Sequence, residues 1–210
     1  MLRSKRYSKD WSKMKNASIY REVFIRNTIH LVANGGFEKA TTRAIAGDRR
    51  EVSNVKLNEA HIYRLFGTKE KLLGEIFSEL DEELIRAVTD NFHIFNTDEP
   101  FREQCWEFYC GLWKFLMQNE EKCRYYTQYY FSSYFRTGGS EEHLKRFEIF
   151  INGLSSRFVD NADVYAIMHH VISTLLNFAT MVYNGDLENN EENTYHIFNV
   201  AYCSIASYIK

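Results

Sequence analysis

The sequence has little of the two residues that most often interrupt helices: one proline and ten glycines in 210 residues. This scarcity excludes collagen-like and low-complexity chains and favours a chain built mainly from helices. Cysteine is also sparse, and its four occurrences form no C-x-x-C pair, which argues against a disulfide scaffold and is typical of a reducing compartment. We therefore expect an all-α protein of the cytoplasm.

Exported and membrane-spanning classes are disfavoured as well. The basic first residues are not followed by the apolar segment of a secretory signal. Residues 164–185 carry no Asp, Glu, Lys or Arg, but they include His169, His170 and several hydroxyl and amide side chains, and aspartates flank them where a spanning helix would have Lys or Arg. We expect a helix buried between protein surfaces, with no membrane partner.

The net charge of −2 hides two regions of opposite sign. Residues 1–72 have 16 Lys+Arg against 7 Asp+Glu, a net charge of +9, whereas residues 73–210 have 10 against 21, a net charge of −11. This separation predicts that the first region approaches a polyanion while the second is repelled from it. A charge split without function is the alternative.

Helix caps and breakers divide the chain into segments. A helix from Ser18 is expected to end at Asn34-Gly35-Gly36, and two short helices follow, one capped by Thr41 or Thr42 and one by Asn58. A helix of about six turns begins after Thr68. Further helices are predicted from Pro100, as the first helical residue, to Gln118, and over residues 120–136, 140–158, 161–183 and about 191–209.

The two short capped helices lie in the basic region and form a helix-turn-helix candidate whose second helix would enter the DNA major groove. The segments GGF at 35–37, TTRAIA at 41–46 and IYRLFGTKEKL at 62–72 resemble the N-terminal part of the TetR (tetracycline-repressor-like) family, over residues 19–80. The resemblance implies a helix-turn-helix domain (18–68) and an effector-binding and dimerisation domain (69–210). The excess of Lys and Arg before the first helix predicts a basic N-terminal arm (1–17) that follows the minor groove or the DNA backbone, with a solvated tail as the alternative. The turn, from Gly47 to His61, is longer than is usual in the family, and the extra residues are expected within 48–55.

Residues with DNA-binding chemistry gather at the starts of the predicted helices. Asn58, as the cap of the second short helix, is counted among the DNA-binding residues, and Glu59 and His61 just after it are expected to meet base edges. The phosphates are assigned to Thr42, Arg43, Lys56, Tyr63 and Lys69. The alternatives are a core role for Tyr63 and a solvated surface role for Glu59 and His61.

Residues 101–135 contain thirteen aromatics, more than one core stripe requires. Trp106, Tyr109 and Trp113 share one helix face, and Tyr126 and Tyr130 share another, so these five are predicted to line a cavity for a small effector, in the place that the resemblance implies. Nearby Glu103 and Glu107 suggest an aromatic or cationic effector. Plain core packing is the alternative.

The last two predicted helices each have two apolar faces. One face can pack in the chain's own core, while the other needs a partner, and two copies would form a four-helix interface. The interface is assigned to one stripe from each helix: Tyr165, Met168, Ile172 and Leu175 from the first, and Phe198, Tyr202 and Ile205 from the second. A monomer with a thick core is the alternative.

The sequence lacks paired E-x-x-H motifs, G-x-S-x-G, a P-loop and G-x-G-x-x-G, so we predict no enzyme, metal or cofactor. The function hypothesis is a ligand-responsive transcriptional regulator, a repressor that binds a palindromic operator in double-stranded DNA as a homodimer. The alternative is a dimer that has lost operator recognition through its lengthened turn and acts as a ligand-binding or protein-interaction module.

Overall fold

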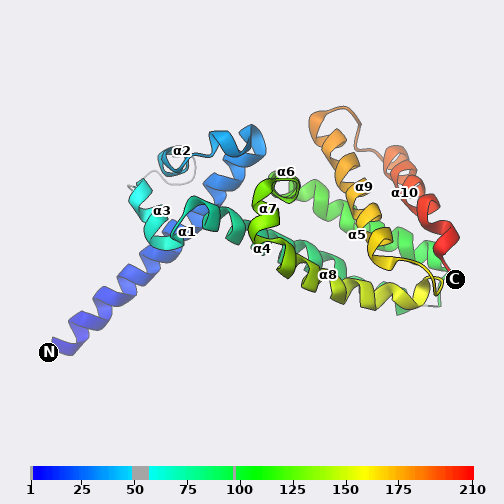
Figure 1. The fold of residues 1–210 in the computed structure, drawn as a ribbon, viewed down its shortest axis with the longest axis horizontal. Coiled ribbons are helices and arrows are strands. Elements are labelled where there is room, and N and C mark those ends of the chain that lie inside the picture. The colour runs from blue at the N-terminus through cyan, green and yellow to red at the C-terminus, as the bar shows by residue number, and fades with distance from the viewer. Residues whose placement is uncertain (1, 49–56, 97) are drawn as a thin grey trace.

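The computed structural model describes residues 2–48, 57–96 and 98–210, with the backbone alone for residues 2–16, 92, 96 and 150. Among these residues the secondary structure is helical, apart from one isolated bridge between Phe158 and Ile209. The head consists of α1 (Leu2–Lys39), α2 (Thr42–Gly47) and α3 (Glu59–Phe66). The long α4 (Lys69–Thr89) leads into a body that contains α5 (Phe101–Gln118), α6 (Glu120–Tyr130), α7 (Ser133–Gly138), α8 (Ser140–Leu154), α9 (Val164–Asn184) and α10 (Glu191–Ile205) (Figure 1). The all-α prediction is confirmed.

Local sequence signals position the helices of the head. The side chains of Thr41, Asn58 and Thr68 each accept a hydrogen bond from a first-turn backbone N–H, of α2, α3 and α4 respectively. Between α3 and α4 the chain turns at Gly67, whose φ of 82° is readily adopted only by glycine. Gly36 has a φ of 76° and breaks the helical geometry of α1 where the sequence predicted a stop.

Several helix boundaries differ from the prediction. The first helix begins at Leu2 rather than Ser18. The segment 120–136 is two helices, because the backbone leaves α6 at Phe131 and the Ser132 side chain caps α7. Pro100 lies one residue before α5, at its N-cap. The last turns of the predicted helices 140–158 and 191–209 are short 3-10 segments, and α9 is capped by Asp163 rather than Asn161.

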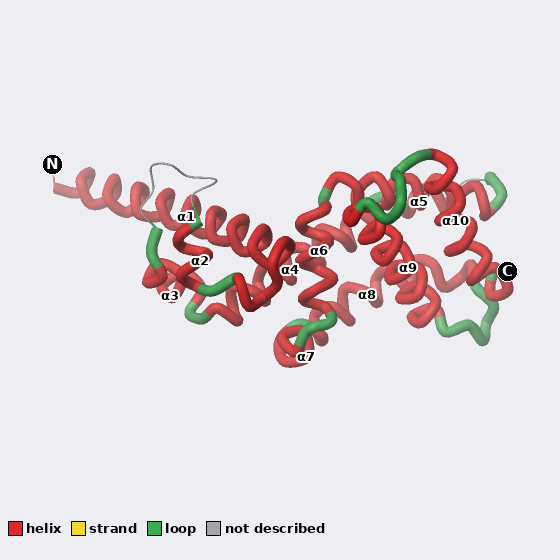
Figure 2. The backbone as a smooth tube through the Cα atoms, turned by 90° about the horizontal axis from the view of Figure 1, so that it is seen from above, coloured by secondary structure: helices red, strands yellow, loops and turns green. Residues whose placement is uncertain are grey.

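One continuous hydrophobic core runs from the head into the body. In the head, Phe24 of α1, Ile45 of α2 and Ile62 of α3 are fully buried. The C-terminal part of α1 packs on α6, and the Gln128 amide donates to the carbonyl of Val32 at 3.0 Å. The head and the body are thus joined by α1 as well as by α4. They lie end to end along the long axis of the molecule (Figure 2).

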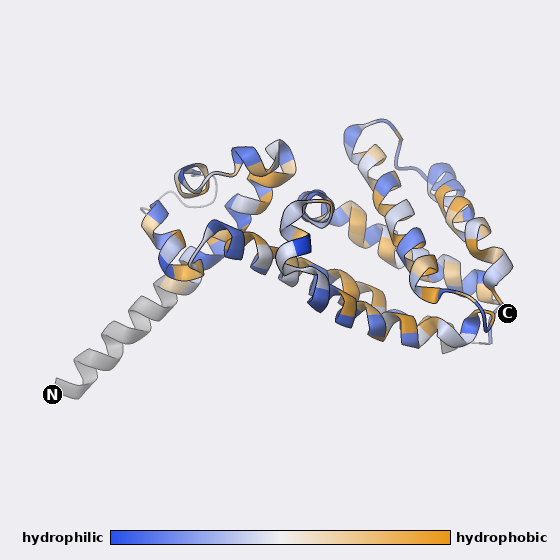
Figure 3. Ribbon diagram, in the orientation of Figure 1, coloured by the Kyte–Doolittle hydropathy of each residue, from blue (hydrophilic) through white to orange (hydrophobic). Residues whose placement is uncertain are grey.

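The body helices carry one buried face each, so hydrophobic and hydrophilic residues alternate along α4 and α8 (Figure 3). The helix α9 is the exception, because residues 164–185 have no charged side chain. By length and hydropathy α9 is able to cross a membrane, a property that it shares with core helices of soluble proteins. It packs against α5, α6, α8 and α10, yet only 22% of the residues in its most apolar stretch are buried.

Candidate functional site

The first candidate site is the helix-turn-helix pair of the head. The Thr42 hydroxyl donates a hydrogen bond to the carboxylate of Glu59 at 2.6 Å, so the start of α2 is tied directly to the start of α3. Asn27 is fully buried and donates to the carbonyls of Ile45 and Asp48, at 2.9 and 3.2 Å, at the end of α2. The Thr42–Glu59 bond thus links α2 to α3, and the two bonds from Asn27 hold the end of α2 against α1.

The start of α3 is held by a reciprocal pair of hydrogen bonds. The N–H of His61 donates to Asn58 Oδ1 at 3.2 Å, and the N–H of Asn58 donates to His61 Nδ1 at 3.4 Å. Because Nδ1 accepts, the neutral imidazole carries its hydrogen on Nε2 and can donate from that atom. The His61 ring also packs against Tyr20, with centroids 5.2 Å apart.

The other residues assigned to DNA divide into exposed and internally bonded side chains. Arg43 and Tyr63 are exposed, and Tyr63 retains 53% of its surface, so a core role for Tyr63 is excluded. Lys69 is half-buried and its ammonium donates to the carbonyl of Phe37 at 3.0 Å, while burial lowers its pKa. Lys56 and the extra residues 49–55 lie outside the described residues. DNA contact by all eight residues stays a prediction.

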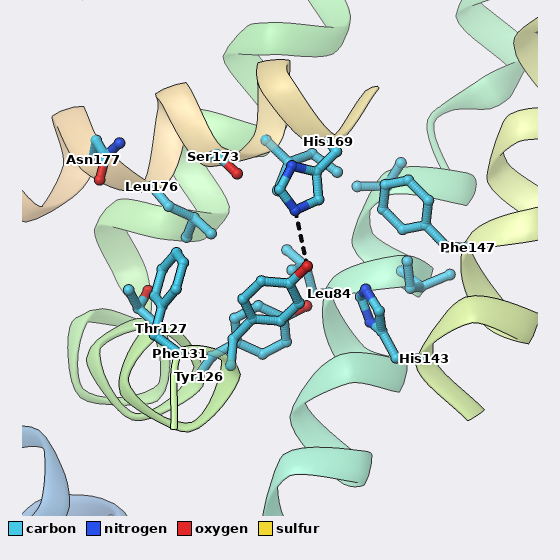
Figure 4. Close-up of a pocket in the computed structure, with 14 residues that line it drawn as sticks. Leu84, Tyr126, Thr127, Phe131, His143, Phe147, His169, Ser173, Leu176 and Asn177 are labelled. Carbon is cyan, nitrogen blue, oxygen red and sulfur yellow. Dashed lines mark hydrogen bonds between the residues drawn. The ribbon is translucent and has the colours of Figure 1, made fainter. Parts of the chain in front are cut away.

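The second candidate site, which we call the histidine cavity, lies between α4, α6, α8 and α9 (Figure 4). Its volume is about 50 Å³. Apolar side chains form most of the wall, and the rings of His143 and His169 point into it from opposite sides. The lining residues are Leu84, Ile85, Val88, Tyr126, Thr127, Tyr130, Phe131, His143, Phe147, His169, Ile172, Ser173, Leu176 and Asn177.

A buried carboxylate supports this cavity from α4. Asp81 is fully buried, and its Oδ1 accepts from His143 Nδ1 at 2.8 Å and from the Tyr126 hydroxyl at 3.1 Å. Its Oδ2 accepts from the Arg146 guanidinium at 3.0 Å. Burial alone would raise the pKa of Asp81, but the hydrogen bonds from His143, Arg146 and Tyr126 outweigh it and hold the pKa below its usual value. Asp81 is therefore an ionised group that joins α4, α6 and α8.

The opposite wall contains a neutral pair. The Tyr130 oxygen lies 2.8 Å from His169 Nε2. Burial raises the pKa of Tyr130 and lowers the pKa of His169, so the hydroxyl keeps its proton and donates to the neutral imidazole.

A second cavity of about 70 Å³, which we call the apolar cavity, lies between α5, α9, α10 and the 3-10 segment Phe92–Asn96. Its walls are aliphatic and aromatic side chains together with Cys105, whose pKa burial raises to about 12. Val88 and Ile172 line both cavities and thus separate them.

The five aromatics assigned to the effector are divided between cavity walls and core. Tyr126 and Tyr130 line the histidine cavity and Tyr109 lines the apolar cavity. Trp106 and Trp113 line neither, because they stack on Tyr109 in a ladder along α5 with ring centroids 5.6 and 5.9 Å from it. Effector binding by these two tryptophans stays a prediction, without support from either cavity. Glu103 and Glu107 are exposed and line neither cavity, so they give no support to a cationic effector.

The stripe assigned to a dimer interface faces inward. Met168, Leu175, Phe198 and Ile205 keep 2–7% of their surface exposed, because α9 and α10 pack on α5 with this face. Ile172 and Tyr202 are half-buried and line the apolar cavity, and Tyr165 alone is exposed. The assignment is wrong for Met168, Leu175, Phe198 and Ile205, which are buried within the chain, and it stays a prediction for Tyr165, Ile172 and Tyr202. On the opposite faces of α9 and α10, Met181 and Val200 remain open to solvent.

Sequence reasoning missed the polar residues that most distinguish the histidine cavity. His143 and Asp81 lie 62 positions apart, and neither belongs to a short motif. The one available signal was an aspartate among the apolar positions of α4, where a buried charge requires a partner.

Comparison with known proteins gives matches among solved structures only: no family model and no curated protein matches the sequence. A TetR family transcription regulator from Marinobacter aquaeolei VT8 superposes with a TM-score of 0.67 at 18% identity, over 92% of this chain and 97% of that one. A TetR-like transcriptional regulator from Rhodococcus sp. RHA1 gives 0.63 at 15% identity, over 90% and 97%. SmeT, the repressor of the Stenotrophomonas maltophilia multidrug efflux pump SmeDEF, gives 0.60 at 14% identity, over 90% of both chains.

Proposed function

Since the chain has the fold of TetR family transcription regulators, we propose that it is a ligand-responsive DNA-binding regulator, a repressor that binds a palindromic operator as a homodimer. The observation that carries the proposal is the coincidence of the helix-turn-helix with the basic region. Residues 1–72, which hold α1, α2 and α3, have a net charge of +9, and the remaining residues have a net charge of −11. A polyanion is therefore attracted to the head and repelled from the body.

The head offers both kinds of DNA contact. Arg43 and Tyr63 are exposed on the two short helices and supply a guanidinium and a hydroxyl for phosphates. His61 Nε2–H and the second carboxylate oxygen of Glu59 supply a donor and an acceptor for base edges at the start of α3. The first backbone N–H groups of α4 form a further site for a phosphate.

A second copy of this chain is the partner that suits the outer faces of α9 and α10. Residues 164–185 and 193–209 contain no Asp, Glu, Lys or Arg, so no charge would be buried when the faces meet. Met181 and Val200 keep about 40% of their surface exposed there. Two-fold packing of this uncharged surface on itself would place two heads on two half-sites of a palindrome.

The effector site is assigned to the histidine cavity, because its walls include α4 and α6, two body helices that pack against α1 of the head. Ligand binding would bias the position of these helices, and hence the separation of the two heads, by a shift between two populations.

The test is selection of bound sequences from a pool of random DNA duplexes at near-physiological salt. We expect an enriched palindrome, and retention that falls steeply as salt is raised. The variant Arg43→Ala should weaken binding and reduce the slope of log affinity against log salt by about one. Arg136→Ala, which removes an exposed arginine from α7 of the body, is the matched control and should leave both unchanged.

His61→Ala should change the preference among sequences, whereas loss of a phosphate contact weakens binding to every sequence alike. Retention without an enriched sequence would contradict operator recognition, and would favour a ligand-binding or protein-interaction module in its place.

A further inference from the structure

We propose that the histidine cavity binds a neutral aromatic alcohol of the phenol class, with its hydroxyl on Nε2 of His143 at the closed end and its ring reaching the mouth beneath Phe131. This inference rests on the proposed function only in taking the histidine cavity as the effector site. It goes further in assigning the charge, the chemical class and the orientation of the ligand.

The histidine cavity has a closed end and a mouth. His143 and Phe147, at the closed end, are buried, whereas Phe131 and Asn177, at the mouth, are exposed and lie on the opposite side of the cavity (Figure 4). A ligand that enters past Phe131 therefore meets His143 at the far end.

His143 supplies a buried ring nitrogen without a partner. Its Nδ1–H donates to Asp81, which lies behind the cavity wall, and Nε2 is on a different edge of the imidazole, so it is directed away from Asp81. The ring is turned toward the cavity (Figure 4), and 4% of the residue's surface is exposed. No described residue forms a hydrogen bond with Nε2. This nitrogen is available to a ligand in a place shielded from bulk solvent.

The tyrosine hydroxyls of the wall are already paired. The Tyr126 hydroxyl donates to Asp81 at 3.1 Å, and the Tyr130 hydroxyl donates to His169 Nε2 at 2.8 Å. Next to them the closed end is formed by carbon-rich side chains, among them Leu84 and Phe147. A second polar group on the ligand would lose its water there without replacement, so the part of the ligand at the closed end has one polar group.

The surrounding charges exclude an ionic ligand. Two carboxylates, Asp81 and Glu82, accept from the single guanidinium of Arg146, and Asp81 accepts from His143 as well. An anion would therefore find no uncompensated positive charge. The residues that line the cavity, within the described part of the chain, include no Asp or Glu, so a cation would find no partner either. The ligand that fits is neutral.

A hydroxyl is the neutral group that suits Nε2 in either state of the imidazole. Because Nδ1 carries a hydrogen, Nε2 accepts in the neutral ring and donates in the charged one. A hydroxyl both donates and accepts, whereas an ether oxygen only accepts. The walls favour an aromatic ring beside it: the rings of Tyr126 and Tyr130 stack with an interplanar angle of 13°, and Phe131 and Phe147 also line the cavity.

The size of the cavity sets the orientation of that ring. The cavity holds about 50 Å³, less than the roughly 150 Å³ of a cavity that encloses benzene. Part of the ring therefore extends toward the mouth, where Phe131 lines the cavity yet keeps 74% of its surface exposed. Ser173 and Asn177 follow His169 at four-residue spacing on the same face of α9, so they offer neutral polar groups to a substituent opposite the hydroxyl.

The first experiment measures binding of four molecules of one shape to the DNA-free protein by calorimetry at about pH 7.5: para-cresol, para-xylene, para-toluate and para-methylbenzylamine. With pKa values near those of Tyr, Glu and Lys, about 10, 4.3 and 10.4, the phenol is neutral, the acid an anion and the amine a cation. Para-cresol should bind about tenfold more tightly than each of the other three. Equal affinity for para-xylene, or for either charged molecule, would overturn the proposal.

The variant His143→Asn separates the two ring nitrogens. The asparagine amide nitrogen takes the place of Nδ1 as a donor to Asp81, and no atom takes the place of Nε2. Para-cresol should weaken about tenfold or more while para-xylene changes far less, because the hydroxyl then loses its water without replacement. A preference for para-cresol that persists in the folded variant would contradict the assignment to Nε2.

His170→Asn is the matched control, because His170 is exposed and bonded to Ser204 outside both cavities, and it should leave the preference unchanged. If the His143 variant does not fold, the order of the four molecules on the wild type decides the matter alone.

The second experiment tests the orientation of the ring. Phe131→Ala should weaken para-cresol and para-xylene alike, by about three- to tenfold, because it removes the aromatic cover of the ring and leaves His143 in place. Ile149→Ala, which removes a side chain of 65% exposure that lines neither cavity, should change neither. Ortho-cresol, with its methyl group at the closed end, should bind about tenfold less tightly than para-cresol. Equal affinity for the two cresols, or no effect of Phe131→Ala, would refute the orientation.

Failure of this inference is distinguishable from failure of the proposed function. Binding of the cresols is measured without DNA, and operator recognition is measured without ligand. An enriched palindrome together with no preference for para-cresol would refute the phenol and leave the regulator. A preference for para-cresol without an enriched sequence would leave the phenol site and contradict the regulator.

Discussion

Replacing Asp81 by asparagine should lower the free energy of unfolding by about 3 kcal/mol, because the carboxylate is a buried ion with donors on both of its oxygens. Tyr126 and His143 donate to Oδ1, and Arg146 donates to Oδ2. Asparagine has one oxygen, so its NH₂ group must face either the guanidinium or the other two donors. Removal of one partner from a buried ion pair costs about 3 to 5 kcal/mol of stability. The oxygen of the introduced asparagine still accepts a hydrogen bond, so we expect a value near the lower end of this range.

Glu82→Gln is the matched control. Glu82 accepts from the same guanidinium at 2.9 Å, but 53% of its side chain is exposed, so the loss of this exposed pair should cost less than about 1 kcal/mol. Urea unfolding followed by far-ultraviolet circular dichroism, at one protein concentration, compares the midpoints at equal slope. On heating, the Asp81 variant should unfold about 6 to 12 °C below the wild type. Equal shifts for the two variants would refute the idea that burial sets the contribution of Asp81.

The pKa of Asp81 is held below its usual value in the folded state, so the carboxylate's contribution to stability is present above about pH 3.9 and is lost as pH falls through the folded pKa. The difference in free energy of unfolding between the wild type and Asp81→Asn should therefore shrink below about pH 4, which urea unfolding at several pH values measures. Gly67→Ala should lower the free energy of unfolding by about 1 kcal/mol or more, because a residue with a Cβ is strained at a φ of 82°. Gly47→Ala, with no atom within 4 Å of the added Cβ, should leave the free energy of unfolding unchanged or raise it in the same assay. Val200→Glu should shift the protein from dimer to monomer in sedimentation velocity, whereas Leu144→Glu, on α8 with a similar 45% exposure, should not; an unchanged dimer in both would place the interface elsewhere.

The sequence predicted best what depends on neighbouring residues. The caps at Asn58 and Thr68 lie where the prediction placed them, because each cap is decided by one side chain and the backbone within a few residues of it. It failed at the α6–α7 break after Tyr130, where the aromatic periodicity continues although the backbone turns.

The faces of α9 and α10 were also beyond the sequence. Both faces of each helix are uncharged, so periodicity cannot tell which of them packs on α5, and Met168 and Phe198 were assigned outward although they are buried. The cavity was found in outline through Tyr126 and Tyr130, but the pairing of Asp81 with His143 depends on how α4 and α8 meet. Tertiary contacts of this kind leave no local pattern.

The two pairs of tyrosines on α6 explain how a ligand in the body would be sensed by the head. Tyr125 and Tyr129 face the head: both rings contact Phe37, just after the break in α1, and the Tyr125 hydroxyl donates to the carbonyl of Leu73 at 2.8 Å. Tyr126 and Tyr130 each follow a residue of the first pair by one position, so they lie on a neighbouring face of α6, and they line the histidine cavity. Because a helix turns as a rigid unit, any rotation of α6 that accommodates a ligand against the second pair must move the first pair against α1 and α4. With the effector in the histidine cavity, as proposed, α6 would act on the head through packing and α4 through the covalent chain.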